Sequence, residues 1–152
     1  MLHGDRKGLK TKRQMKIYSK ITGQLLHIIQ RGTFLANRVD IVPPEQYLQV
    51  AALNLPEGKT FKAHKHIENP RVVQRAQESW CVISGHIRAL LYDLDDAILE
   101  EIDLYAGDIS ITLAGGHNYI AVEQSCVYEY KTPQYQGQEK DKVFIDEING
   151  EK

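Results

Sequence analysis

Two histidines separated by a single residue are the first candidates for chemistry in this chain. His64 and His66 lie in the run 60–66, whose composition predicts a β-strand. Because side chains alternate between the two faces of a strand, both imidazoles would point the same way and could reach one metal ion. A lone pair of this kind more often belongs to the surface or the core, so a metal site needs further ligands.

The spacing around the histidine pair supplies those ligands. The first motif reads Gly58, five residues, His64-Lys65-His66, eleven residues, Glu78, six residues, Gly85. The second motif runs from Gly107 through Ala114-Gly115-Gly116 to His117. Gly107 and Gly115 stand at strand boundaries, where we expect a positive φ angle or a close backbone approach.

Together the two motifs resemble those of the cupin family, and the resemblance covers about residues 45–132. It implies an all-β fold, the cupin double-stranded β-helix, which is a jelly-roll-like antiparallel barrel. It also implies one divalent metal inside the barrel, held by His64, His66, Glu78 and His117. Glu68 is a competing carboxylate, but we favour Glu78 because it begins a predicted strand and six residues separate it from Gly85.

Three imidazoles and one carboxylate form a donor set for borderline first-row ions. Fe²⁺, Mn²⁺, Ni²⁺, Zn²⁺ and Cu²⁺ all accept such ligands, so the identity of the metal stays open. Four protein ligands around an octahedral ion would leave two positions for water, a chelating substrate or oxygen.

The rest of the chain indicates which elements would position these residues. Short apolar and β-branched runs recur between Gly, Pro, Asp and Asn residues, which predicts an antiparallel sandwich or barrel. The predicted strands are 47–55, 60–66, 78–84, 86–93, 98–104, 109–113, 118–123 and 126–132, with 142–145 as a further candidate. Residues 16–30 suit either a helix or two short strands around Thr22-Gly23, and we favour extended structure. A basic tail at 1–15 would precede a single cupin domain at 16–152.

Several side chains near the ligands could form a recognition shell. Trp80 shares the parity of Glu78 in its strand, and Arg88 follows in the next strand. We assign proton transfer to Glu129 and Tyr128, and substrate binding to Trp80, Arg88, Tyr130 and Lys131. The alternative is structural, with Trp80 in the barrel core and Glu129 paired with Lys131 in solvent.

Composition narrows the class of partner. Nineteen basic and twenty acidic residues leave a formal charge of −1, so neither nucleic acid nor an anionic membrane is an expected partner. No apolar run has the length of a signal peptide or a membrane span, and we expect a cytoplasmic protein. Cys81 and Cys126 are expected to be buried, reduced thiols. The cupin resemblance also implies a homodimer.

Two functions remain open. In the first, a metal-dependent enzyme acts on a small hydroxylated or carboxylated compound by isomerase-like, epimerase-like or dioxygenase chemistry. In the second, the chain is a metal-dependent binding or sensor module without turnover. The segments 115–119 and 128–135 are similar to uncharacterised bacterial cupins that accompany surface-polysaccharide genes, which points to a sugar derivative as the small-molecule partner.

Overall fold

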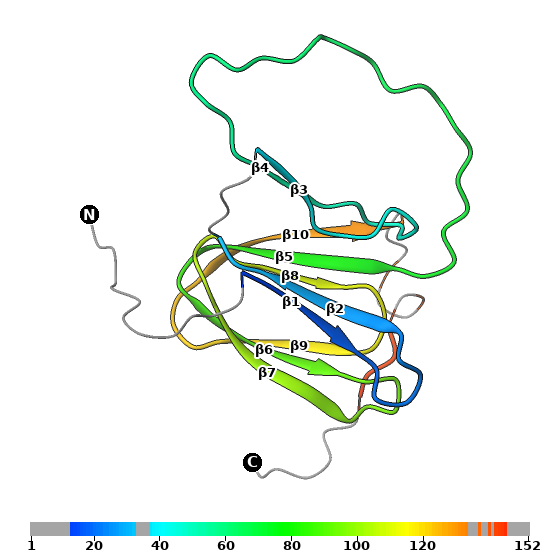
Figure 1. Ribbon diagram of the computed structural model, residues 1–152. Coiled ribbons are helices and arrows are strands. Elements are labelled where there is room, and N and C mark those ends of the chain that lie inside the picture. Colours follow the sequence, from blue (N-terminus) through cyan, green and yellow to red (C-terminus); the bar gives the residue numbers. More distant parts are fainter. Residues whose placement is uncertain (1–12, 33–36, 134–136, 138–139, 141, 146–152) are drawn as a thin grey trace.

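The computed structural model describes residues 13–32, 37–133, 137, 140 and 142–145, and its regular elements are ten β-strands (Figure 1). They are β1 (Gln14–Tyr18), β2 (Leu25–Gln30), β3 (Arg38–Asp40), β4 (Ala51–Leu53), β5 (Gln77–Ser84), β6 (His86–Tyr92), β7 (Ile98–Tyr105), β8 (Ile109–Thr112), β9 (His117–Ala121) and β10 (Cys126–Thr132). Every strand pairing is antiparallel. The all-β class predicted from the sequence is therefore confirmed.

Two sheets make up the body of the molecule (Figure 1). The larger sheet has the order β1-β2-β8-β5-β10, and the smaller sheet has the order β7-β6-β9. A separate ribbon contains β3 and β4. Across the described residues the sheets form a sandwich and do not close into a barrel, so the architecture is established as an antiparallel β-sandwich.

Apolar side chains fill much of the space between the two sheets. Ile29 and Val82 of the larger sheet belong to one cluster with Leu91 and Leu104 of the smaller sheet, and all four are fully buried. Burial of each large aliphatic side chain contributes about 1.5–3 kcal/mol. A second cluster packs the opposite face of the larger sheet against residues near β3 and β4. The larger sheet therefore packs apolar side chains on both of its faces, with those of β8 on the face toward β3 and β4.

Most predicted strands are present, usually with bounds shifted by a residue or two. Residues 16–30 contribute to two strands joined by a turn in which Gly23 has φ 72°, so the extended interpretation is confirmed. The strand predicted at 60–66 is wrong, because the chain between β4 and β5 forms a long exposed segment without a strand (Figure 1). A strand needs a hydrogen-bonding partner, and no described strand pairs with this segment. The candidate run 142–145 is not a strand either.

Two predicted glycine turns position the second motif. Gly107 between β7 and β8 has φ 85°, and Gly115 between β8 and β9 has φ 77°, as the sequence predicted. A Cβ atom on Gly115 would also collide with the carbonyl oxygen of Tyr92. The turn at Gly115 carries the chain from the larger sheet to the smaller one, so that β9 begins at His117.

The two cysteines lie on neighbouring strands without facing each other. Cys81 of β5 is opposite Tyr128, whereas Cys126 of β10 is opposite Ser84, and both thiols are free. Burial raises the pKa of the Cys81 thiol. Cys126 is exposed, so the prediction that both thiols are buried is wrong for Cys126.

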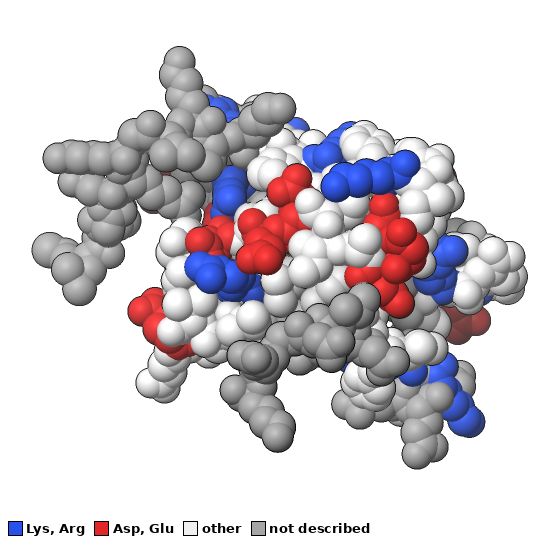
Figure 2. Space-filling view, turned by 90° about the horizontal axis from the view of Figure 1, so that it is seen from below, with Lys and Arg blue, Asp and Glu red and all other residues white. Residues whose placement is uncertain are grey.

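Charges of both signs share the surface of the molecule. Figure 2 shows acidic and basic side chains interspersed on one face, in agreement with the formal charge of −1. Within the described residues, no helix has the length and apolar character needed to cross a membrane. Residues 1–12 of the predicted basic tail lie outside the described residues, and β1 already begins at Gln14.

Candidate functional site

The larger sheet carries polar residues in two rows that run across its strands. The first row consists of successive cross-strand partners on β2, β8, β5 and β10, namely His27, Thr112, Glu78 and Lys131. The second row lies two residues away on three of these strands and consists of Ser110 on β8, Trp80 on β5 and Glu129 on β10. Residues two apart on a strand share a face, so the two rows form one polar area on the same side of the sheet.

Strand β9 of the smaller sheet brings two more side chains to this area. His117 and Tyr119 are opposite Leu91 and Ala89 of β6, which are core residues, so all four point toward the larger sheet. The ring of Tyr119 stacks on Trp80 with centroids 4.2 Å apart. The hydroxyl of Tyr119 donates a hydrogen bond to Ser110 Oγ at 2.9 Å. Side chains from both sheets therefore meet at this site.

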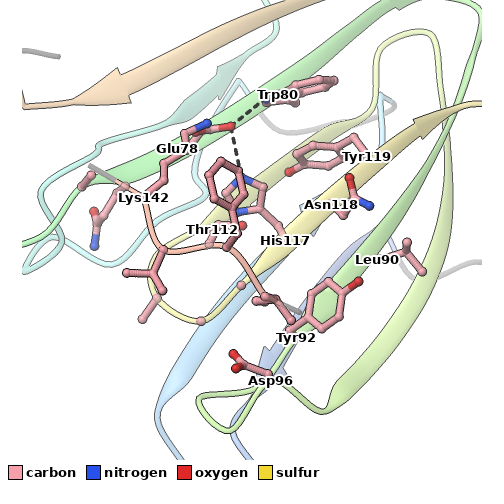
Figure 3. A pocket seen from close by; sticks show the side chains of 18 of the residues that line it. Glu78, Trp80, Leu90, Tyr92, Asp96, Thr112, His117, Asn118, Tyr119 and Lys142 are labelled. Carbon is pink, nitrogen blue, oxygen red and sulfur yellow. Dashed lines mark hydrogen bonds and ion pairs between the residues drawn. The ribbon is translucent and has the colours of Figure 1, made fainter. Parts of the chain in front are cut away.

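Glu78 lies at the centre of the site (Figure 3). Its Oε1 accepts hydrogen bonds from Trp80 Nε1 at 2.9 Å and from His117 Nε2 at 3.2 Å. Its Oε2 lies 3.5 Å from Lys131 Nζ, which is also 3.0 Å from Glu129 Oε1. One carboxylate thus connects an indole, an imidazole and an ammonium group.

These neighbours keep Glu78 ionised. Burial by itself would raise the pKa of Glu78. The hydrogen bond from His117, the positive charge that His117 carries when it is protonated, the hydrogen bond with Glu129 and the charge of Lys131 lower this pKa to about 2. The pKa of Lys131 is raised, since the hydrogen bond and charge of Glu129 and the charge of Glu78 outweigh its burial. The site therefore holds the carboxylate of Glu78 and the ammonium group of Lys131 in their charged forms at neutral pH.

The hydrogen bond to Glu78 also determines which nitrogen of His117 carries a proton. An ionised carboxylate only accepts, so His117 Nε2 must be the donor. Nδ1 of a neutral His117 then has a lone pair, and this atom is buried without a hydrogen-bond partner among the described residues. Buried polar atoms are normally satisfied, so His117 Nδ1 is suited to accept a proton from a ligand or to bind a metal ion.

His27 on β2 stabilises the site through two hydrogen bonds of its imidazole ring. It is completely buried, with Nε2 at 2.9 Å from the carbonyl oxygen of Tyr92 and Nδ1 at 3.1 Å from Thr112 Oγ1. Since a carbonyl oxygen only accepts, Nε2 carries the proton and the hydroxyl of Thr112 donates to Nδ1. Burial lowers the pKa of His27 to about 4, which keeps its imidazole neutral. His27 thereby fixes the direction of the Thr112 hydroxyl beside Glu78.

A cavity of about 1030 Å³ opens beside these residues. Its wall combines the acidic and basic groups of the two rows with aromatic and apolar surface, and includes Glu78, Trp80, Thr112, His117, Tyr119, Glu129 and Lys131. Volumes near 300–1,000 Å³ are typical of small-molecule sites, and such sites combine apolar walls with a few oriented polar groups. The cavity is therefore the candidate site for a small molecule.

Five of the residues predicted from the sequence meet here, namely Glu78, Trp80, His117, Glu129 and Lys131. Tyr128 and Tyr130 do not line the cavity, because their parity on β10 places them on the opposite, exposed face of the larger sheet. Arg88 is also outside the cavity. It alternates with the buried Ile87 and Ala89, and its Nε lies 3.0 Å from Asp103 on the outer face of the smaller sheet.

The predicted histidine pair lies elsewhere in this structure. His64 and His66 are exposed in the segment between β4 and β5, with ring centroids 5.4 Å apart. Glu68 lies in the same exposed segment, so Glu78 is the carboxylate beside His117. Within the described residues, no group of three or more His, Cys, Asp or Glu side chains is arranged to hold a metal ion.

Sequence reasoning missed three residues of the site, namely His27, Thr112 and Tyr119. Tyr119 follows His117 by two residues in a predicted strand, so its orientation could have been inferred. His27 interrupts the apolar run of β2, and a single polar residue in a buried strand is a signal for a satisfied internal group. For Thr112 the sequence contains no comparable signal.

Comparison with protein-family models, curated proteins and solved structures finds no match for this chain. The fold and the site together define an antiparallel β-sandwich with a charged, partly aromatic cavity at Glu78 and His117.

Proposed function

We propose that this chain is a metal-dependent enzyme of the cupin type that acts on a small hydroxylated or carboxylated compound, such as a sugar derivative. The observation that carries the proposal is the contact between Glu78 and His117, which come from opposite sheets and meet at the wall of the cavity. Two proton-exchanging groups that meet beside a cavity are candidates for a functional site.

The chemistry of the cavity wall suits a polar ligand, because acidic, basic, hydroxyl and aromatic side chains all line it. Trp80 and Tyr119 provide an aromatic surface, while Thr112 and Glu129 provide hydrogen-bonding groups. Arg75 and Lys142 also line the cavity, and neither makes an ion pair with any other described residue. A carboxylate or phosphate on a hydroxylated compound would complement these two cations.

Two donors of the predicted metal site are already together. The carboxylate of Glu78 and the imidazole of His117 are donor types that suit borderline first-row ions, and His117 Nδ1 has no partner among the described residues. Because Glu78 accepts from Nε2, on the other side of the ring, the imidazole would have to turn for one ion to bind both side chains. Fe²⁺, Mn²⁺, Ni²⁺, Zn²⁺ and Cu²⁺ all fit this donor set. The chemistry of these two donors therefore suits a metal ion, but two ligands alone would hold it weakly. His64 and His66 would complete the set.

The edge of β9 offers a place for the histidine pair. Among the described strands, β9 pairs only with β6, so its other edge has unpaired backbone groups. In the segment between β4 and β5, Ile67 is 86% exposed, and on β9 Ile120 is 45% exposed. If residues 60–66 paired with β9, Phe61 and Ile67 would share the face of Ile120, and His64 and His66 the face of His117. Such pairing would bury apolar surface and complete the metal site together.

A bound divalent ion would act as a Lewis acid on a carbonyl or hydroxyl oxygen of the substrate. The residues of the chain would orient His117 and accept the proton. Glu78 orients His117 through the 3.2 Å hydrogen bond, and Lys131 holds Glu129 at 3.0 Å. The carboxylate of Glu129 lines the cavity, where it is placed to accept a proton from the substrate. Isomerase-like or epimerase-like chemistry requires such a base.

A ligand screen tests the proposed function. We expect at least one compound among monosaccharides, sugar acids and sugar phosphates to raise the melting temperature of protein loaded with Zn²⁺, Mn²⁺ or Fe²⁺, and to lose this effect in EDTA. The substitution Glu129→Gln should abolish turnover of that compound as followed by NMR, since the amide cannot accept the proton. Glu123→Gln, at an exposed position outside the cavity, is the matched control.

The outcomes separate the two functional classes. Metal-dependent binding with turnover supports the enzyme, and oxygen consumption with Fe²⁺ identifies the dioxygenase variant. Binding without turnover in the wild-type protein would replace the enzyme by a binding or sensor module. If no compound binds with any of the metals, the proposed substrate class is wrong.

A further inference from the structure

A short segment near the C-terminus forms part of the cavity wall without belonging to a strand. Lys142, Val143, Phe144 and Ile145 all line the cavity. In Figure 3 the chain runs on from Lys142 across the cavity in the direction of Tyr92. No backbone hydrogen bond to another described residue holds residues 142–145. Among the described residues, side-chain contacts are therefore the interactions that hold the segment in place.

Gly116 provides the contact that anchors this segment. A Cβ atom on Gly116 would collide with Ile145 Cδ1 and would lie 3.3 Å from Tyr92 Cβ. Gly116 does not have a positive φ angle, in contrast to Gly115, so its backbone conformation is open to other residues. Because Gly116 has no side chain, it leaves a space that the side chain of Ile145 occupies.

The remaining apolar side chains of the segment are poorly held. Val143 is 97% exposed and Phe144 is 75% exposed, whereas Ile145 is partly buried. A segment with one buried side chain and few backbone hydrogen bonds opens at a much lower free energy than the sheets do. The contact between Ile145 and Gly116 therefore decides whether the segment covers the cavity.

We propose that residues 142–145 form a strap that controls access to the cavity, with Ile145 as its anchor on Gly116. When Ile145 leaves its place, the strap swings away and exposes the wall that contains Trp80 and His117. This inference goes beyond the proposed function, because it requires neither a metal ion nor a particular substrate.

The fluorescence of Trp80 measures whether the strap covers the cavity. Trp80 is the one tryptophan of the chain and it lines the cavity. Quenching of its fluorescence by acrylamide measures how easily a small solute enters. We expect Ile145→Ser to raise the quenching constant roughly twofold, since it removes the apolar anchor, and Gly116→Ala to raise it less, since its methyl group only displaces the end of the Ile145 side chain. Val72→Ser changes an exposed apolar residue outside the cavity and should leave the quenching constant unchanged.

The melting temperature and the far-UV circular dichroism of each variant verify that the sheets are intact. Ile145→Ser lies outside every strand, so it keeps the test valid if Gly116→Ala disturbs the turn before β9. The strap is excluded if intact Ile145→Ser protein has the quenching constant of the wild type. It is also excluded if Val72→Ser raises the quenching constant equally. Because the experiment uses metal-free protein without ligand, its result is independent of the proposed function.

Discussion

Replacing His117 with alanine is expected to weaken the binding of Zn²⁺ by at least about tenfold, since even residues that only support metal ligands contribute factors of 10–100. His117 is the one histidine that lies beside Glu78 among the described residues, and its Nδ1 lacks a partner. Competition with a chromophoric chelator measures the affinity. His86→Ala is the matched control, because His86 contacts Asp103 on the outer face of the smaller sheet.

The pH dependence of this affinity has a definite sign. A metal ion binds the neutral form of histidine, so protons compete with it as the pH falls through the ordinary imidazole range near 6.5. Zn²⁺ binding should therefore be strong at neutral pH and lost on acidification. If His117→Ala binds Zn²⁺ as tightly as the wild type, His117 is not a ligand and the metal site lies elsewhere.

The second large effect concerns the stability of the metal-free protein at acidic pH. The pKa of His27 is about 4 in the folded protein, chiefly because of burial, and 6.5 is its ordinary value. Above pH 6.5 His27 is neutral in both the folded and the unfolded states. Between pH 6.5 and pH 4 the unfolded chain takes up the proton and the folded protein does not. The free energy of unfolding should therefore fall by about 3 kcal/mol over this window.

Denaturant unfolding in EDTA at pH 7 and at pH 4 tests this expectation. The substitution His27→Gln is the control, since glutamine does not titrate and can donate to the carbonyl of Tyr92 while accepting from Thr112. The stabilisation of ionised Glu78 is lost only as the pH falls from about 4.5 toward 2, which is largely below the window. Equal losses of stability in the wild type and in His27→Gln would mean that His27 does not cause the pH dependence.

The strands from β5 to β10 could be predicted from the sequence because strong turn signals separate them. Gly85, Gly107 and Gly115 all have positive φ angles, which few other residues adopt, and each lies between two strands. The run 60–66 has the alternation of a strand but no described partner. Local pattern indicates that a segment can be a strand, whereas pairing depends on which edges the rest of the chain leaves available.

Only part of the site could be predicted from the sequence. Glu78 and His117 were identified by spacing, and the fold brings them within hydrogen-bonding distance. Parity within a strand correctly grouped Trp80 with Glu78. For Arg88 the alternation of its apolar neighbours was a usable signal that it points outward. Contacts between the sheets, such as the stacking of Tyr119 on Trp80, depend on how the sheets pack and leave no trace in the sequence.

The central claim is that Glu78 and His117 belong to a metal site that His64 and His66 complete. Hydrogen exchange of residues 60–66, measured with and without Zn²⁺, tests this claim most directly. We expect Zn²⁺ to protect these amides in the wild type and in Glu68→Gln, because the segment pairs with β9 when the metal binds, and to have no effect in Glu78→Gln. Equal exchange rates of residues 60–66 with and without Zn²⁺ in the wild type would contradict this claim. Protection of residues 60–66 by Zn²⁺ in Glu78→Gln would also contradict it.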